Sequence, residues 1–125
     1  MTKKKILVVD DEAPITRFLK IALERAGTYE IQTENHGSLA LKAAAAFRPD
    51  LILLDINLED ENGGEISERF QKNLELKEIP IVFLTGAVSP SEVDSGMATI
   101  SGRDVVAKPV NMEKLVQTIE KNLKT

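Results

Sequence analysis

Side chains that can take part in chemistry stand at four points where an apolar run of the sequence stops. The acidic run Asp10-Asp11-Glu12 follows the first apolar run, and Asp55 ends another. Thr85 ends a third run, and Lys108 follows a fourth. Taken singly, such residues are helix caps, turn residues or solvated side chains. Brought together, they would form a cluster of carboxylates with one hydroxyl and one cation.

Such a cluster predicts a magnesium site and phosphoryl chemistry. Neighbouring carboxylates raise each other's pKa and need positive charge, which Lys108 supplies in part and a divalent cation would complete. The sequence has no cysteine and one histidine, His36, so an all-oxygen Mg²⁺ site is favoured over Zn²⁺. The predicted reaction is attack of the Asp55 carboxylate on phosphorus. Lys108 would neutralise the phosphoryl oxygens, and the Thr85 hydroxyl would donate to one of them.

The apolar runs predict the strands that position these residues. Residues 6–9, 51–54 and 81–84 are continuously apolar, as expected of parallel strands covered on both faces. Residues 105–107 form a shorter run, and residues 29–33 alternate as an edge strand does. We therefore expect the first, third and fourth strands inside the sheet and the second and fifth at its edges.

Helical periodicity fills the intervals between these strands. Pro14 suits a first turn, Gly27 and Pro49 lie where two helices should end, and Asn111 is a predicted N-cap. A further helix is predicted near residues 91–97, where the pattern is less regular. The four clearer apolar stripes are Ile15, Phe18, Leu19, Ala22 and Ala26; Leu39, Ala43, Ala46 and Phe47; Ile66, Phe70 and Leu74; and Met112, Leu115, Val116, Ile119 and Leu123.

Strict alternation of strands and helices predicts an α/β fold, a flavodoxin-like (βα)5 three-layer sandwich. Its parallel five-stranded sheet should have the order 2-1-3-4-5. Ligands of such sheets bind beyond the carboxyl ends of the strands, where strands one and three diverge. Asp10, Asp55, Thr85 and Lys108 should therefore converge on one rim.

Composition narrows the function classes. With 125 residues, 42% hydrophobic and 29% charged, the chain should form one globular domain over residues 1–125. A net charge of −4 argues against direct nucleic-acid binding. Neither a membrane span nor a signal peptide is predicted, so we expect a cytoplasmic protein without a membrane partner. Triads that use serine or cysteine with histidine lack the necessary parts.

The same segments resemble the receiver domain of two-component response regulators. The resemblance covers essentially the whole chain, in residues 6–12 (ILVVDDE), 49–55 (PDLILLD) and 79–85 (IPIVFLT), Gly63 and Lys108-Pro109. It implies a phosphoprotein that carries an aspartyl phosphate and catalyses only its own phosphorylation and dephosphorylation, with no separate enzymatic activity. The donor would be a sensor histidine kinase or a histidine phosphotransfer protein.

The resemblance also implies a role for each site residue. Asp11 would bind Mg²⁺ directly and Asp10 through water. Asp55 would be both phosphoacceptor and metal ligand, and the backbone carbonyl of Asn57 would complete the protein ligands. Thr85 and Lys108 would hold the phosphoryl group. The signal would pass to a partner or output domain through the face formed by the fourth helix, fifth strand and fifth helix, and a phosphorylation-dependent homodimer stays open.

Three residues depart from the family pattern. Glu59 stands where proline is frequent and begins an acidic run with Asp60 and Glu61; Val105 replaces a common aromatic residue, and Gly86 a common alanine or serine. The branched Val105 side chain cannot swing as an aromatic ring does. We therefore expect output to depend on reordering of residues 86–102, which are rich in serine, glycine and threonine, with Thr85 coupling it to phosphorylation.

Two alternatives share this fold or chemistry. A degenerate receiver would keep the partner surface without using phosphate, but the complete set of acidic, hydroxyl and lysine residues argues against it. A phosphohydrolase with an aspartyl intermediate would need a general acid/base, for which Glu59 is the nearby candidate. A P-loop nucleotidase is discarded because its glycine-rich signature is missing.

Overall fold

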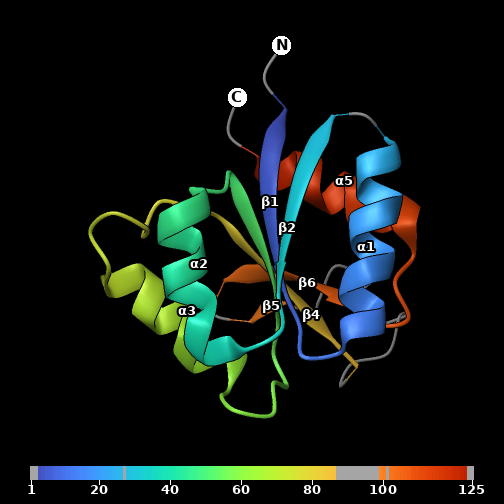
Figure 1. Cartoon of the computed structure of the whole chain (residues 1–125). Coiled ribbons are helices and arrows are strands. Elements are labelled where there is room, and N and C mark those ends of the chain that lie inside the picture. Colours follow the sequence, from blue (N-terminus) through green and yellow to red (C-terminus); the bar gives the residue numbers. More distant parts are fainter. Residues whose placement is uncertain (1–2, 27, 87–98, 101, 124–125) are drawn as a thin grey trace.

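The protein has a single β-sheet with helices on both faces (Figure 1). The computed structural model describes residues 3–26, 28–86, 99–100 and 102–123. The sheet order is β2-β1-β3-β4-β6-β5. Its first five members in this order are parallel, which confirms the predicted order 2-1-3-4-5 with β6 as the fifth strand. The strands are β1 (Lys4–Val9), β2 (Tyr29–Glu34), β3 (Leu51–Asp55), β4 (Ile81–Thr85), β5 (Thr99–Ile100) and β6 (Arg103–Ala107).

One detail of the predicted sheet is wrong. The predicted fifth strand, β6, is not the edge, because the two residues of β5 pair with it in the antiparallel direction. Thr99 lies opposite Asp104 and Ile100 opposite Arg103. Two residues are too few to show the period of two by which a strand is recognised in a sequence.

The helices form the two outer layers of the predicted sandwich. Figure 1 shows α1 and α5 on one face of the sheet and α2 and α3 on the other. Among the described helices, none is long and apolar enough to cross a bilayer. The helix predicted near residues 91–97 and the helix end predicted at Gly27 lie outside the described residues. The helical segments are α1 (Ala13–Arg25), the 3-10 turn η1 (Gly37–Leu39), α2 (Ala40–Phe47), α3 (Gly63–Lys72) and α5 (Met112–Asn122).

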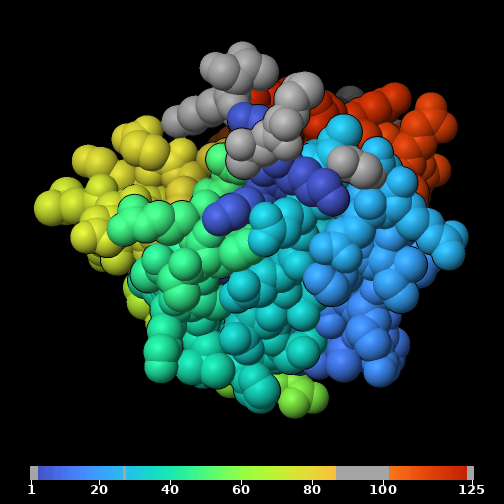
Figure 2. Space-filling model, turned by 45° about the horizontal axis from the view of Figure 1, so that its top comes forward, coloured from blue at the N-terminus to red at the C-terminus, as the bar shows by residue number. Residues whose placement is uncertain are grey.

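The core lies on both faces of the sheet, which explains the continuous apolar runs. In β1, Ile6 and Val8 pack in the cluster with α1 and α5, whereas Leu7 and Val9 pack in the cluster with α2 and α3. All four side chains are fully buried. By contrast, β2 is an edge strand with one wetter face. Figure 2 shows its cyan surface between the blue side of α1 and the green side of α2.

Predicted helix boundaries are confirmed in α1, where Pro14 lies in the first turn, in α2, which ends at Phe47 before Pro49, and at the start of α5. Asn111 accepts the N–H of Lys114 at the start of α5, as expected of an N-cap. Leu74, predicted on the stripe of α3, instead lies beyond the helix with 83% of its surface exposed. The reason is Asn73, whose side chain accepts the backbone N–H of Glu75 and Leu76 and turns the chain away.

Candidate functional site

Four strand ends bring the predicted site residues to one rim of the sheet, at the lower end of Figure 1. Asp10 follows β1, Asp55 ends β3, Thr85 ends β4 and Lys108 follows β6. The register pairs Val9 with Leu54, Asp55 with Leu84 and Thr85 with Ala107, so neighbouring strands stop at nearly the same level. Asp10 and Thr85 are fully buried, and Asp55 is only 3% exposed.

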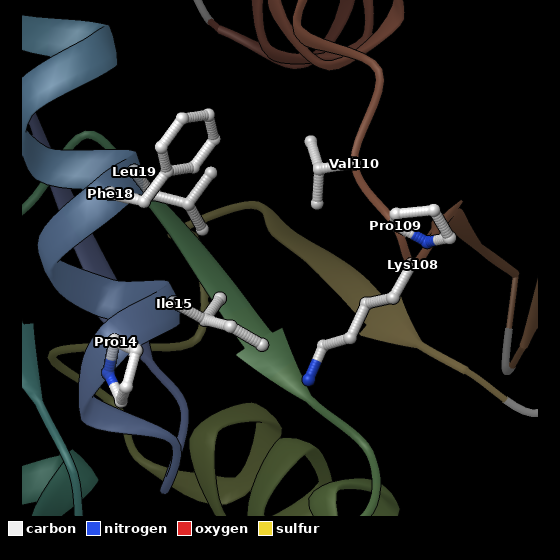
Figure 3. A pocket seen from close by; sticks show the side chains of 7 residues that line it. All are labelled: Pro14, Ile15, Phe18, Leu19, Lys108, Pro109 and Val110. Carbon is white, nitrogen blue, oxygen red and sulfur yellow. The ribbon is translucent and has the colours of Figure 1, made fainter.

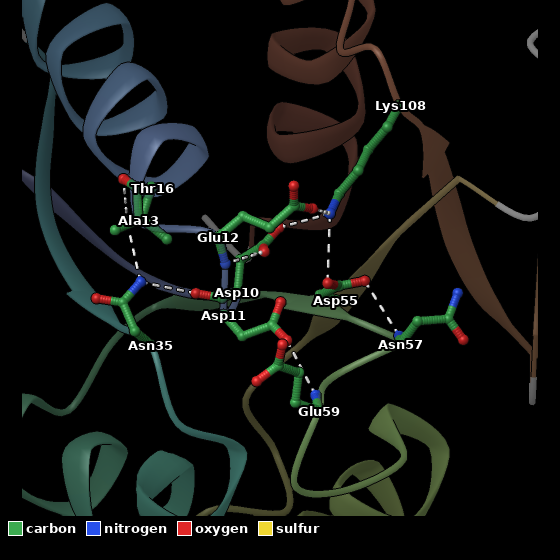
Figure 4. Close-up of polar contacts among 10 residues, drawn as sticks. All are labelled: Asp10, Asp11, Glu12, Ala13, Thr16, Asn35, Asp55, Asn57, Glu59 and Lys108. Atoms are coloured by element: carbon green, nitrogen blue, oxygen red, sulfur yellow. Dashed lines mark hydrogen bonds and ion pairs between the residues drawn. The ribbon is translucent and has the colours of Figure 1, made fainter.

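Lys108 lies at the centre of the charges. Its Nζ atom is 2.8 Å from Asp10 Oδ2, 3.2 Å from Glu12 Oε1 and 3.3 Å from Asp55 Oδ2 (Figure 4). The lysine side chain is 15% exposed, so it is largely withdrawn from water. A cation shared among three carboxylates relieves their repulsion and fixes their orientation.

Burial and charge shift the pKa of both members of the closest pair. Burial is the largest effect at Asp10 and raises its pKa, although contacts with Lys108 and the N–H of Glu12 oppose the shift. Burial alone would lower the pKa of Lys108. The contact with Asp10 and the charges of Asp10 and Asp55 outweigh it, so the pKa of Lys108 is raised and the ammonium stays charged.

The loop after β3 completes the rim. The N–H of Asn57 donates to Asp55 Oδ1 at 3.1 Å, and the N–H of Glu59 donates to Asp11 Oδ2 at 2.9 Å (Figure 4). The loop returns to β3 at Gly63, where a Cβ atom would lie 2.5 Å from the carbonyl oxygen of Asp55. Only glycine allows this close approach, which explains why glycine occupies position 63.

The donor set fits a hard divalent cation. Among the described residues, Asp10, Asp11, Glu12 and Asp55 form a group whose ligand oxygens all lie within 4.8 Å of one another. All four donors are carboxylate oxygens, the ligand type that Mg²⁺ prefers. Lys108 compensates only part of their negative charge.

Comparison with known protein families identifies the family of this chain. The response regulator receiver domain family matches residues 6–120. The chain belongs to this family. The acidic pocket of Asp10, Asp11 and Asp55 at the strand ends is consistent with the phosphoacceptor site of a receiver domain.

Individual relatives agree with this assignment. The receiver domain is 35% identical to the nisin biosynthesis regulatory protein NisR of Lactococcus lactis subsp. lactis, over 96% of this chain and 50% of that protein. It is 34% identical to the phosphate regulon transcriptional regulatory protein PhoB of Pseudomonas aeruginosa, over 96% and 52%. The chain thus spans about half the length of the curated relatives it matches.

Solved structures share the receiver fold. The chemotaxis protein CheY4 of Vibrio cholerae superposes with a TM-score of 0.82 and 32% identity, covering 98% of this chain and 100% of that chain. The N-terminal domain of a response regulator receiver protein from Methanoculleus marisnigri is 34% identical, with a TM-score of 0.71 and 99% coverage of each chain.

The receiver domain places all predicted site residues at this rim, while their individual roles stay predictions. Two further residues belong to the site, although the sequence assigned no role to either. Glu12 pairs with Lys108, and the Asn35 amide donates to the carbonyl of Asp10 at 2.8 Å and to Thr16 Oγ1 at 3.1 Å. The signals were present: Glu12 is the third member of the acidic run, and Asn35 directly follows β2.

An apolar pocket of about 390 Å³ adjoins the receiver site between α1 and the segment after β6. Figure 3 shows Lys108 reaching past it, with its ammonium directed toward the carboxyl end of β3. Phe18 is 54% exposed, which is unusual for a large aromatic side chain. The lining residues are Pro14, Ile15, Phe18, Leu19, Lys108, Pro109 and Val110.

Proposed function

We propose that residues 1–125 form one receiver domain in which Asp55 accepts a phosphoryl group. The observation that carries the proposal is the position of Lys108 Nζ, 3.3 Å from Asp55 and 2.8 Å from the buried Asp10. One ammonium thus lies beside the proposed nucleophile, where it can neutralise charge on incoming phosphoryl oxygens. The domain has no activity on a separate substrate and catalyses only the gain and loss of its own phosphate.

Mg²⁺ fits the carboxylate set, and we assign Asp11, Asp55 and the backbone carbonyl of Asn57 as direct ligands, with Asp10 acting through water. When bound, the ion supplies positive charge to the phosphoryl oxygens. Asp10 is better suited to the indirect role because its side chain is fully buried and its Oδ2 atom lies 2.8 Å from Lys108 Nζ, closer than Asp55 Oδ2 at 3.3 Å.

The transfer step uses the chain's own groups. A carboxylate oxygen of Asp55 forms a bond to phosphorus, while the bond from phosphorus to the donor breaks and the donor keeps the electron pair. The N–H of Asn57, donating to Asp55 Oδ1, holds the carboxylate in orientation. The Lys108 ammonium neutralises negative charge first on the Asp55 carboxylate and then on the phosphoryl oxygens. Thr85, at the adjacent strand end, is assigned to donate its hydroxyl to the same group.

The donor is a phosphohistidine on a sensor histidine kinase or phosphotransfer protein, and the domain acts in the cytoplasm. The signal passes on through the face that includes β6 and α5. The predicted reordering concerns residues 86–102, most of which lie outside the described residues. Val105 is buried in the core cluster of α2 and α3 and stays in place on phosphorylation.

A small phosphodonor is expected to add one phosphate to the domain only when Mg²⁺ is present. Asp11→Ala should lose both Mg²⁺ binding and phosphorylation yet remain folded. Its Oδ2 atom accepts one backbone N–H, a modest loss that relief of carboxylate repulsion offsets. Intact-mass measurements with Mg²⁺ and with excess chelator check this. Equal phosphorylation under the two conditions would refute the metal requirement.

The apolar pocket supports a docking position for the protein donor. It shares Lys108 with the phosphorylation site, so a donor seated there brings its phosphohistidine close to Asp55. Phe18→Ala should slow phosphorylation by a protein donor about tenfold, the effect of losing about 1.4 kcal/mol of contact energy, and leave the rate with a small phosphodonor unchanged. Leu74→Ala removes a more exposed apolar side chain that does not line the pocket and serves as the control. Equal slowing with both donors would contradict the docking assignment.

A further inference from the structure

The loop between β3 and α3, residues 56–62, carries three consecutive acidic residues that make different contacts. Glu61 Oε2 lies 2.7 Å from Arg69 Nη2 of α3, the helix that directly follows this loop. The N–H of Glu59 donates to Asp11 at the rim. Of the two acidic side chains with these contacts, the Asp60 carboxylate is the one that joins the loop to a segment more than 20 positions earlier in the sequence.

Asp60 binds two consecutive backbone N–H groups at the start of η1. Its Oδ1 atom accepts from Gly37 at 3.1 Å, and its Oδ2 atom accepts from Ser38 at 2.9 Å. One carboxylate therefore connects the loop after β2 to the loop after β3. Hydrogen bonds to an ionised acceptor are about twice as strong as those between neutral groups.

On the side of η1, these hydrogen bonds act together with the packing of the buried Leu58 side chain. Gly37 is buried where the two loops meet, and a Cβ atom there would lie 2.9 Å from Leu58 Cδ1. On the other side, a pocket of about 280 Å³ separates the loop from the start of α1. Packing cannot fix the loop across that pocket. The lining residues are Asp11, Ala13, Asn35, His36, Glu59 and Asp60.

We propose that Asp60 is a positioning residue for the metal site. By anchoring the loop to Gly37 and Ser38, it keeps the N–H of Glu59 on Asp11 and the backbone of Asn57 beside Asp55. Asp60 itself touches neither the metal nor the phosphoryl group. This inference rests on the proposed function and names a residue that prepares the same site.

The anchor should affect the affinity for Mg²⁺ and leave the rate at saturation unchanged. Without it the loop samples more conformations, and Mg²⁺ binding must restore the order at the expense of affinity. Once the ion is bound, Asp11, Asn57 and Asp55 regain the arrangement they have in the wild type. Phosphorylation at saturating Mg²⁺ should then proceed at the wild-type rate.

The test compares Asp60→Ala and Asp60→Asn with the wild type. Asp60→Ala should raise the Kd for Mg²⁺ about tenfold, as loss of outer-sphere support does at other metal sites. Asp60→Asn keeps one carbonyl acceptor, so its Kd for Mg²⁺ should lie between those of the wild type and Asp60→Ala. Hydrogen exchange of the Glu59 amide, measured without metal, should be faster in both variants because its bond to Asp11 is made less often.

Asp50→Ala is the matched control. Asp50 is also a loop aspartate whose carboxylate accepts a distant backbone N–H, that of Lys5 at 2.8 Å, but it lies at the opposite end of β3. It should leave the Kd for Mg²⁺ and the Glu59 amide unchanged. Wild-type affinity in Asp60→Ala, or an equal loss in Asp50→Ala, would overturn the positioning role. Failure of the wild type to bind Mg²⁺ would instead refute the proposed function.

Discussion

Asp55→Asn is expected to abolish phosphorylation by both small and protein donors while leaving the domain folded. An amide is a poor nucleophile, so no bond to phosphorus forms. The variant keeps the acceptor for the N–H of Asn57 and gives up the contact with Lys108, which retains Asp10 and Glu12. We expect the free energy of unfolding to change by less than about 1 kcal/mol, because loss of one ion pair is offset by reduced carboxylate repulsion.

Intact-mass spectrometry checks the loss of phosphorylation in Asp55→Asn, and thermal unfolding of the same preparation checks that the variant remains folded. Asp50→Asn is the control, because it changes the aspartate that precedes β3 at the far end of the strand and should leave the phosphate yield intact. An unchanged phosphate yield in Asp55→Asn would remove Asp55 as the acceptor.

Lys108→Ala is expected to have two separable effects. The thermal shift caused by beryllofluoride and Mg²⁺ should disappear, because the cation that neutralises the phosphoryl mimic is gone. Stability should also fall, by about 3 kcal/mol near neutral pH, because the fully buried Asp10 loses its counter-charge. The sequence alone does not reveal this effect on stability, because it does not show how deeply Asp10 is buried.

The loss of stability in Lys108→Ala should depend on pH. The pKa of Asp10 is already raised, chiefly by burial, so the folded state holds the proton more tightly than the unfolded state. The contribution of Asp10 to stability therefore falls as pH rises from the ordinary aspartate value through the raised one. Removing Lys108 raises the pKa of Asp10 further. The variant should then lose most stability at neutral pH and least below about pH 4, where aspartates become protonated.

Denaturant unfolding at several pH values measures this dependence. Lys121→Ala is the matched control, because it removes a lysine that pairs with Asp104 at 3.3 Å but is 72% exposed. It should cost little at any pH. A loss in Lys108→Ala that is the same at acid and neutral pH would show that the lysine does not compensate Asp10.

The sheet and the rim could be predicted because they follow from local patterns. Continuous apolar runs mark buried parallel strands, and the carboxyl ends of parallel strands meet at one edge. The positions of Asp10, Asp55, Thr85 and Lys108 at the rim follow from these two rules alone. The order of the strands required one further inference, that the most apolar strands lie inside.

The contacts made by loops could not be predicted in this way. Glu12 pairs with Lys108 across 96 positions of sequence, and Asp60 reaches Gly37 across 23. No periodic pattern in the sequence predicts either contact, because each depends on the path of a loop between fixed strand ends. The acidic run of Glu59, Asp60 and Glu61 was noticed as unusual, but only the structure assigns each member its contact.

Locating the phosphate in the wild-type domain tests the central claim most directly. The domain is phosphorylated by a small phosphodonor with Mg²⁺, the acyl phosphate is reduced with borohydride to homoserine, and the digest is sequenced by mass spectrometry. The account predicts homoserine at position 55 alone, and none when Mg²⁺ is chelated. Homoserine at Asp10 or Asp11 with Asp55 unmodified, or no modification despite Mg²⁺, would contradict it.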